Sequence, residues 1–160
     1  MLFRSEAILE IMSLTRVATS EHGVLAKMQL SEGLPHVFGD RVQLQQVILN
    51  LIMNAIEAMS EVTEGSRELL ISTGRIKPDG VLVAVSDSGP GLPHADPERL
   101  FEAFYTTKAS GLGMGLSICR SIIQNHGGRL WAAPNEPRGA VFSILLPADQ
   151  VAASLVDITP

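Results

Sequence analysis

The chain has 160 residues, of which 46% are hydrophobic and 18% are charged, and its formal net charge at pH 7 is −5. This length fits one domain with a substantial buried core, and the composition excludes extensive disorder. A net negative chain without a run of Lys and Arg is poorly suited to a nucleic-acid backbone, and its apolar runs are far shorter than the roughly 20 residues of a membrane span.

The N-terminal sequence MLFRSEAILE lacks the basic region and the long apolar region of a signal peptide. The single cysteine, Cys119, excludes an internal disulfide, which fits a reducing compartment. We therefore expect this part of the protein to be cytoplasmic.

In chain order, the first predicted element is a helix over residues 4–22, which ends at a glycine. Alternating apolar residues predict a strand over 24–30. Asp40 is a good N-cap for a second helix, with Gln43 in the position that a capping box requires. The helical pattern then continues to Met59, and a turn follows it.

The second half of the chain begins with a predicted hairpin, whose strands are residues 67–76 and 81–87. A long segment rich in Gly and Pro follows over 88–113, with a short helix near 97–103, and segments of this kind are usually functional lids. A helix over 115–126 and a second hairpin, RLWAAP with AVFSILLP, complete the pattern. The elements predict an α+β fold: a two-layer α/β sandwich whose mixed, mainly antiparallel sheet is covered on one face by helices.

Polar residues interrupt the apolar pattern of the second helix at Asn50 and Asn54, which are one turn apart and project from the same face. Glu57 continues this face. For an isolated pair of Asn residues, a solvated polar edge would be the simpler interpretation. Two later segments that let a ligand approach the backbone, DSGPG and GLGMG, favour a nucleotide site instead.

Four motifs in this order, NLIMNAIEAM, DSGPGLP, LFEAFYTTK and GLGMGLSI, carry a resemblance to a known family. Over roughly residues 5–147 the chain resembles the catalytic, ATP-binding domain of sensor histidine kinases. This superfamily also contains the type II topoisomerase ATPases, the Hsp90 chaperones and the mismatch-repair ATPases. The resemblance implies a Bergerat-type ATP-binding fold. The sequence around the first motif is most similar to that of the oxygen- and nitrogen-responsive kinases.

The resemblance implies a role for each polar residue of the helix. Asn54 would offer its amide oxygen to a Mg²⁺ ion that holds the phosphates of ATP, because Mg²⁺ takes a few hard oxygen ligands from the protein and others from phosphate and water. Asn50 would bind a phosphate or a metal-bound water, and Glu57 would accept hydrogen bonds from the metal's waters. Asp87 would read the exocyclic amine of adenine, because a carboxylate is an acceptor without a donor, and would thereby select ATP over GTP.

The lid and the second glycine motif complete the expected site. Phe101 and Phe104 are expected to anchor the lid by burying two rings. Lys108 would lie near the outer phosphates as a point charge, although a solvated surface lysine is the alternative. The backbone amides that open the helix at 115 would favour phosphate oxygens. The candidate nucleotide-binding residues are Asn50, Asn54, Glu57, Asp87, Gly89, Gly91, Thr106, Thr107, Lys108, Gly111, Gly113, Gly115 and Leu116, with Asn54 as metal ligand and with Asn54 and Lys108 as catalytic candidates.

In this family a histidine on a separate helical hairpin accepts the phosphoryl group, but no histidine of this chain has the expected context. His22 and His126 precede glycines at helix ends, His36 follows a proline, and His94 is in the lid. The chain therefore resembles a catalytic domain over residues 23–147. Residues 1–22 would be its N-terminal helix or a connection to a dimerisation hairpin that this chain lacks, and 148–160 would be a tail or linker.

The leading interpretation is a domain that binds ATP and Mg²⁺ and transfers the γ-phosphoryl group to a histidine of the dimerisation hairpin, with a response regulator downstream and the full-length protein in the cytoplasm or anchored to a membrane. Related ATPases place a water-activating Glu where this chain has Asn50, so hydrolysis should be slow. An anti-sigma-type serine kinase is one alternative, which the lid with two Phe and Thr-Thr-Lys disfavours. A nucleotide-binding interaction module without transfer activity is another, which the intact Asn54, Asp87 and glycine set disfavours.

Overall fold

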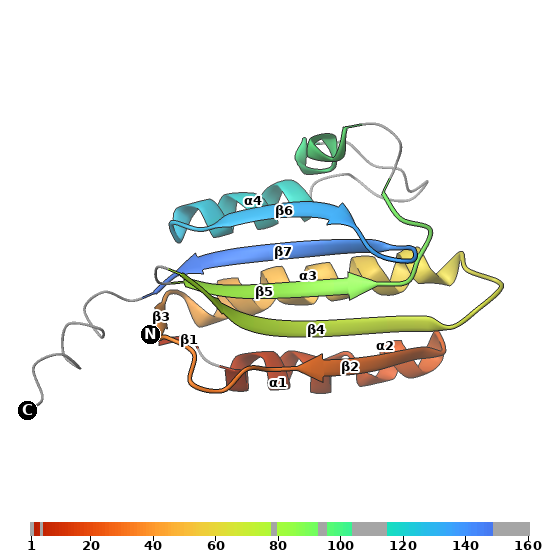
Figure 1. The fold of residues 1–160 in the computed structure, drawn as a ribbon, viewed down its shortest axis with the longest axis horizontal. Helices are drawn as coiled ribbons and strands as arrows, with labels where there is room; N and C mark the ends of the chain where they lie inside the picture. The colour runs from red at the N-terminus through yellow and green to blue at the C-terminus, as the bar shows by residue number, and fades with distance from the viewer. Residues whose placement is uncertain (1, 4, 78–79, 93–95, 104–114, 149–160) are drawn as a thin grey trace, which may run out of the picture.

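A mixed sheet forms one layer of the fold, and the helices form the second layer behind it (Figure 1). The computed structural model describes residues 2–3, 5–77, 80–92, 96–103 and 115–148. Within them, five strands lie side by side in the order β2-β4-β5-β7-β6. Their bounds are β2 Val24–Gln29, β4 Arg67–Ile76, β5 Gly80–Asp87, β6 Arg129–Pro134 and β7 Ala140–Pro147.

The pairing of the strands confirms the predicted class of sheet. β2 runs parallel to β4, whereas β4–β5, β5–β7 and β6–β7 are antiparallel pairs. Both predicted hairpins, β4–β5 and β6–β7, are present. The connection from β2 to β4 contains the longest helix, because parallel neighbours need a long crossover.

The longest helix, α3 (Arg41–Ser60), lies against the middle of the sheet (Figure 1). Its N-cap is Asp40, as predicted, and the Asp40 side chain accepts a hydrogen bond from the Gln43 amide at 3.1 Å. Its buried residues recur at helical spacing and face the sheet and the neighbouring helices. They are Leu44, Val47, Ile48, Leu51, Ile52, Ala55, Ile56 and Met59.

The helix predicted over residues 4–22 is divided in the structure into α1 (Ser5–Leu14) and α2 (Arg16–Glu21), so the prediction of one helix was wrong. At the break, the Thr15 hydroxyl donates to the Met12 carbonyl at 3.1 Å. Threonine side chains bond backbone carbonyls of the preceding turn in this way, and such bonds bend helices. Ile8 and Ile11 of α1 are fully buried in the main core.

Smaller elements complete the description. A two-stranded sheet of β1 (Leu2–Phe3) and β3 (Val37–Phe38) was not predicted. The short helix expected near 97–103 is a 3₁₀ helix, η1 (Pro97–Phe101), and the helix expected over 115–126 is α4 (Gly115–Asn125).

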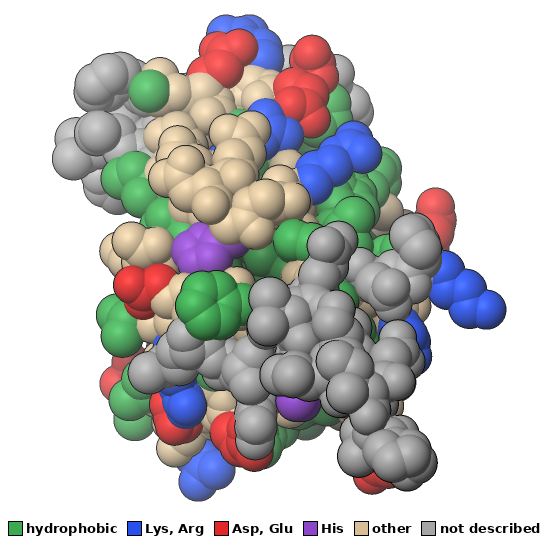
Figure 2. Space-filling model, turned by 90° about the vertical axis from the view of Figure 1, so that its left-hand side faces the viewer, with side chains coloured by type: hydrophobic (Ala, Val, Ile, Leu, Met, Phe, Trp, Pro, Cys, Tyr) green, Lys and Arg blue, Asp and Glu red, His purple; other side chains and the backbone are tan. Residues whose placement is uncertain are grey.

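The character of the helices and of one face of the molecule can be followed in the described residues (Figure 2). Among the described helices, none combines the length and the apolar character that crossing a bilayer requires. Figure 2 shows the end of the molecule near β1 and β3, where acidic and basic side chains are interspersed among apolar ones. On the described part of this face there is no continuous basic field of the kind that binds a polyanionic backbone.

Candidate functional site

Asn50 and Asn54 meet on one face of α3, as their spacing predicts. The Asn54 Nδ2 group donates a hydrogen bond to Asn50 Oδ1 at 3.2 Å, and both side chains are half-buried. This bond turns the carboxamide of Asn54 so that its nitrogen faces Asn50 and its oxygen lies at the opposite end of the group. Glu57, one turn further along α3, is exposed.

Gly115, the first residue of α4, lies directly against Asn50. A Cβ atom built on Gly115 would be 3.1 Å from Asn50 Nδ2 and 3.3 Å from Asn50 Oδ1, closer than an ordinary van der Waals contact. The absence of a side chain therefore allows the start of α4 to reach the polar face of α3. Leu116 is half-buried and packs against the core, so its proposed contact with a nucleotide stays a prediction.

Asp87 is the last residue of β5, and its side chain is only 4% exposed. Its Oδ1 atom accepts hydrogen bonds from the backbone amides of Gly89 at 2.9 Å and Ala140 at 3.3 Å. Asn135 supports the same residue by donating from Nδ2 to the Asp87 carbonyl oxygen at 2.8 Å. Among the described residues no donor reaches Oδ2, so this oxygen remains to accept a hydrogen bond from a ligand.

The burial of Asp87 raises the pKa of its carboxyl group above the ordinary value of 3.8. The hydrogen bonds from the Gly89 and Ala140 amides lower this pKa, but their effect is smaller than that of desolvation. The side chain is therefore a desolvated acceptor, and a neutral donor such as an amine can pair with it without bringing a counter-charge.

Glycines surround Asp87 at close range. A Cβ atom on Gly89 would lie 3.0 Å from Asp87 Oδ1 and 3.5 Å from the Cβ of Ala58 on α3. Gly139 has a φ of +104°, and a Cβ there would lie 1.9 Å from the Asp87 carbonyl oxygen. Gly91, with a φ of +93°, packs against the Gly139 backbone. Only glycine combines these backbone angles with this proximity.

The separate motifs line up along α3. Asp87 approaches the helix through Gly89 at Ala58, Asn54 is one turn before Ala58, and Asn50 with its neighbour Gly115 is one turn earlier. Residues at i, i+4 and i+8 share one helix face and here span about 12 Å along the axis. The arrangement provides a buried carboxylate acceptor at one end and amide groups with a helix N-terminus at the other.

The 3₁₀ helix η1 is fixed to the body by Phe101, which is buried as predicted. The Phe101 ring packs edge-on against Phe142 of β7, with the ring centroids 6.3 Å apart. On η1, the Asp96 side chain accepts from the Glu98 amide at 3.0 Å and caps the helix. The guanidinium carbon of Arg120 lies 3.9 Å from the Phe101 ring centroid, a contact that the sequence patterns did not predict.

The hydrogen bonds of two histidines support the view that they are structural. His126 Nε2 accepts from the Asp40 amide at 3.0 Å, and its Nδ1 lies 2.7 Å from the Ile122 carbonyl oxygen. Both ring nitrogens of His126 are therefore occupied. His22 Nδ1 lies 2.9 Å from the Ala18 carbonyl oxygen, at the end of α2.

Several predicted site residues fall outside the described part of the chain, so their roles stay predictions: Thr106, Thr107, Lys108, Gly111 and Gly113, together with the second lid phenylalanine Phe104 and with His94. Burial raises the pKa of the Cys119 thiol to about 12, so this cysteine is an unreactive core residue. Among the described residues no cluster of three or more His, Cys, Asp or Glu could hold a metal ion. The amide oxygen of Asn54 fits a hard cation that takes most of its ligands from phosphate and water, and the Glu57 carboxylate fits an acceptor for the waters of such a cation.

Comparison with known families gives a match over most of the chain. The model of the histidine kinase-, DNA gyrase B- and HSP90-like ATPases matches residues 39–150. The chain is 43% identical over 144 residues to the sensor protein FixL of Bradyrhizobium diazoefficiens, a match that covers 90% of the chain and 28% of FixL. It is 41% identical over 133 residues to the sensor histidine kinase TmoS of Ectopseudomonas mendocina, covering 82% of the chain and 14% of TmoS.

Solved structures with the same fold include the catalytic domain of the histidine kinase ThkA in a nucleotide-free form. It superposes with a TM-score of 0.81 at 34% identity, over 92% of this chain and 95% of that domain. ThkA in complex with the response regulator protein TrrA gives a TM-score of 0.78 at 32% identity, over 93% of this chain and 42% of the ThkA chain. The present chain thus matches 95% of the ThkA catalytic domain, and it spans less than a third of the length of FixL or TmoS.

Proposed function

Because the chain belongs to the histidine kinase-, DNA gyrase B- and HSP90-like ATPases, we propose that it is the ATP-binding catalytic domain of a sensor histidine kinase. The observation that supports this most directly is the alignment of Asp87, Asn54 and Asn50 along α3. That arrangement suits a ligand with a purine at one end and a polyphosphate at the other.

At the purine end, Asp87 Oδ2 accepts the exocyclic amine of adenine. The two backbone amides on Oδ1 hold the carboxylate in place, and Gly89 leaves room for the base. Guanine presents a carbonyl oxygen at the equivalent position, which would face another oxygen and leave both groups without a donor.

At the phosphate end, Asn54 would offer its amide oxygen to Mg²⁺ and Glu57 would accept hydrogen bonds from the waters of the metal. Asn50 and the first turn of α4 would lie beside the phosphates. The Asn50–Asn54 hydrogen bond orients the Asn54 oxygen before the nucleotide arrives. Mg²⁺ bound there would neutralise charge on the phosphate oxygens. Thr106, Thr107, Lys108, Gly111 and Gly113 are proposed to complete the phosphate contacts, and Lys108 is proposed to take part in transfer.

In the proposed reaction an imidazole nitrogen of the histidine on a separate dimerisation hairpin attacks the γ-phosphorus. The bond from that phosphorus to the β–γ bridging oxygen breaks, and ADP leaves. The residues of this chain bind and orient ATP, and Asn50 supplies no base to activate water, so hydrolysis is slow. Because the proposed reaction consumes ATP and supplies a response regulator, the domain is proposed to work in the cytoplasm.

The packing of α1 bears on the proposed domain limits. Ile8 and Ile11 of α1 lie in the core, which supports assigning α1 to the catalytic domain and leaving the hairpin connection to the residues before it. The match to ThkA bound to TrrA supports a response regulator as the downstream partner. Residues 148–160 are proposed to be a tail or linker.

The test of this function is a transfer experiment. The 160-residue domain is mixed with γ-labelled ATP, Mg²⁺ and candidate histidine-bearing hairpins, and we expect label on the hairpin in an acid-labile, base-stable form. An acid-stable product would identify a hydroxyl acceptor and the serine-kinase alternative. Binding of ATP without transfer to any hairpin of a related kinase would favour the interaction module.

Replacing Gly115 by Ala should weaken binding of a non-hydrolysable ATP analogue about threefold, or ~0.7 kcal/mol. The added Cβ would press on Asn50, which is held by Asn54, while the helix itself gains from the substitution because alanine is a better helix former. Calorimetry and thermal unfolding should therefore move in opposite directions. Gly74→Ala is the matched control, since a Cβ there meets nothing within 4 Å, and equal affinities for the two variants would contradict the role of Gly115.

A further inference from the structure

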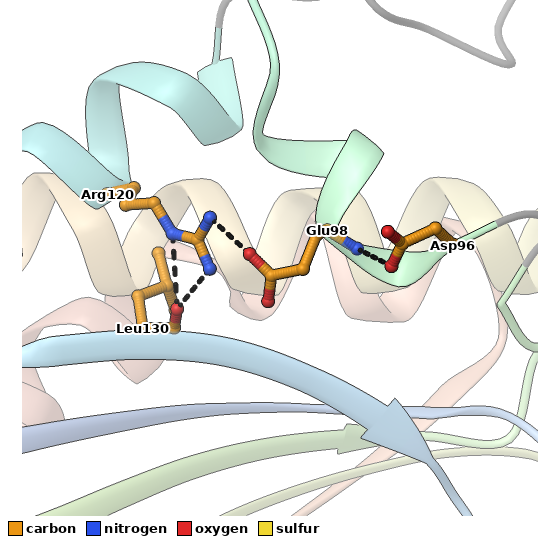
Figure 3. Close-up of polar contacts among 4 residues, drawn as sticks. All are labelled: Asp96, Glu98, Arg120 and Leu130. Carbon is orange, nitrogen blue, oxygen red and sulfur yellow. Dashed lines mark hydrogen bonds and ion pairs between the residues drawn. The ribbon is translucent and has the colours of Figure 1, made fainter.

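Arg120 connects three elements that flank the proposed phosphate end (Figure 3). It lies on α4, and its Nη1 donates to Glu98 Oε2 of η1 at 2.7 Å. Its Nε and Nη2 donate to the Leu130 carbonyl oxygen of β6 at 3.3 and 3.0 Å. The same guanidinium lies over the Phe101 ring, so one side chain joins α4, η1 and β6.

These contacts differ from those of an ordinary surface ion pair. The Arg120 side chain is only 23% exposed, whereas the Glu98 side chain is 60% exposed and belongs to η1, which Asp96 caps. All three nitrogens of the planar guanidinium are used, two on a carbonyl and one on a carboxylate, with the flat face on an aromatic ring. The hydrogen bond to Arg120 is the largest of the effects that lower the Glu98 pKa. A lysine could not reproduce this set, because its ammonium group is a single point without a fork.

The elements that Arg120 joins are those that place the phosphate end of the site. α4 begins at Gly115, which contacts Asn50, and η1 carries Phe101, which is packed on β7 through Phe142. We infer that Arg120 is a positioning residue that holds the start of α4 and η1 in a fixed relation around the polyphosphate of ATP. This inference rests on the proposed function, because it assigns the phosphates to that end of α3.

Arg120 does not act by attracting the phosphates directly. Each of its three nitrogens donates one hydrogen bond to Leu130 or Glu98, and the Glu98 carboxylate compensates its charge. Direct attraction of the phosphates and positioning of α4 and η1 predict opposite changes in nucleotide affinity when the Glu98 carboxylate is removed. Removing a carboxylate near a polyanion would strengthen binding by simple electrostatics, whereas removing a partner of the positioning residue weakens it.

The experiment compares a non-hydrolysable ATP analogue with AMP, by calorimetry on the 160-residue protein. AMP carries the base and no outer phosphates. Arg120→Ala should lower affinity for the ATP analogue about tenfold and leave affinity for AMP within about twofold of wild type. Arg120→Lys should behave like Arg120→Ala. Glu98→Ala should lower affinity for the ATP analogue about threefold.

Glu102→Ala is the matched control, since Glu102 is as exposed as Glu98 and is near Arg99 instead, at 3.9 Å. It should leave both affinities unchanged. The inference is overturned if Arg120→Ala lowers the two affinities equally or changes neither, or if Glu98→Ala tightens binding of the analogue. Should Arg120→Ala fail to fold, the variants Glu98→Ala and Glu102→Ala, at two exposed positions, still show whether loss of the Arg120 partner weakens or strengthens binding of the analogue. A wild-type protein that binds neither ligand would instead reject the proposed nucleotide site itself.

Discussion

Asn54→Ala is expected to abolish the Mg²⁺ dependence of ATP binding and to reduce phosphoryl transfer at least about a hundredfold, which corresponds to ~2.7 kcal/mol of lost transition-state stabilisation. The substitution removes the one amide oxygen that is oriented by the Asn50 hydrogen bond toward the proposed metal position. Without it, the protein would offer Mg²⁺ no direct ligand, and Glu57 would contact only the waters of the metal. Calorimetric titration with and without Mg²⁺, followed by transfer assays with a histidine hairpin, measures both effects.

Gln45→Ala is the control for loss of an amide from the same helix. Gln45 bonds the Ala7 carbonyl at 3.1 Å and Glu10 at 2.9 Å, on the side of α3 that packs against α1. Its loss should lower thermal stability and leave Mg²⁺-dependent binding intact. If the Asn54→Ala variant transferred the phosphoryl group at the wild-type rate, the assignment of Asn54 as a metal ligand would be wrong.

Asp87→Asn is expected to weaken ATP binding at least tenfold, or about 1.4 kcal/mol. The new amide can keep Oδ1 on the Gly89 and Ala140 backbone groups, which places its NH₂ group where Oδ2 was. The adenine amine then meets a donor in place of an acceptor. GTP should lose less affinity than ATP, so the preference between the two nucleotides shrinks, and competition titrations measure this ratio.

The same variant tests the electrostatics of the site in the absence of nucleotide. Because burial raises the Asp87 pKa, the contribution of this residue to stability is fully present below the pKa of the unfolded chain. It is lost as the pH rises through the raised pKa of the folded state. Asp87→Asn should therefore be more stable than wild type at neutral pH, and the advantage should vanish on acidification below pH 3.8. Asp40→Asn, a change between two good N-caps, is the control and should leave the affinity for ATP unchanged.

The central helix and the Asn pair were predictable because they depend on local periodicity. All the signals lie in one short segment, Asp40 and the helix α3 that follows it. They are the apolar spacing of the helix, its Asp40 cap and the i,i+4 relation of Asn50 and Asn54. Both hairpins were predictable for the same reason, since turn residues separate strands that are adjacent in sequence.

The support of Asp87 was not predictable from local pattern. Asn135, Gly139 and Ala140 reach Asp87 only because β7 pairs with β5 across more than 50 residues, and the register of that pairing is not visible in either strand alone. A signal was present, however: the Pro-Arg-Gly sequence at the second hairpin turn marks a backbone position reserved for glycine. The contacts of Arg120 were not predicted because an arginine on an amphipathic helix is ordinarily interpreted as a solvated side chain.

The break at Thr15 shows a different limit. The apolar spacing of residues 4–22 is nearly continuous, and the chain keeps helical backbone bonds across the break, from Thr15 to Ile11 and from Thr19 to Thr15. The Thr15 hydroxyl bonds the Met12 carbonyl at the break, but Thr19 makes the same kind of bond to Arg16 inside α2, where the helix continues. Apolar periodicity predicts which residues are buried, and it does not predict where a helix is interrupted.

Since both ends of the proposed site lie against one uninterrupted helix, the distance between them follows the helical rise of α3. Insertions in the surrounding loops could change access or release without altering that interval. We therefore expect substitutions to be tolerated unevenly. Asn50, Asn54 and the glycines whose backbone lies beside them should vary little among related proteins, whereas the solvent-exposed turns should vary freely.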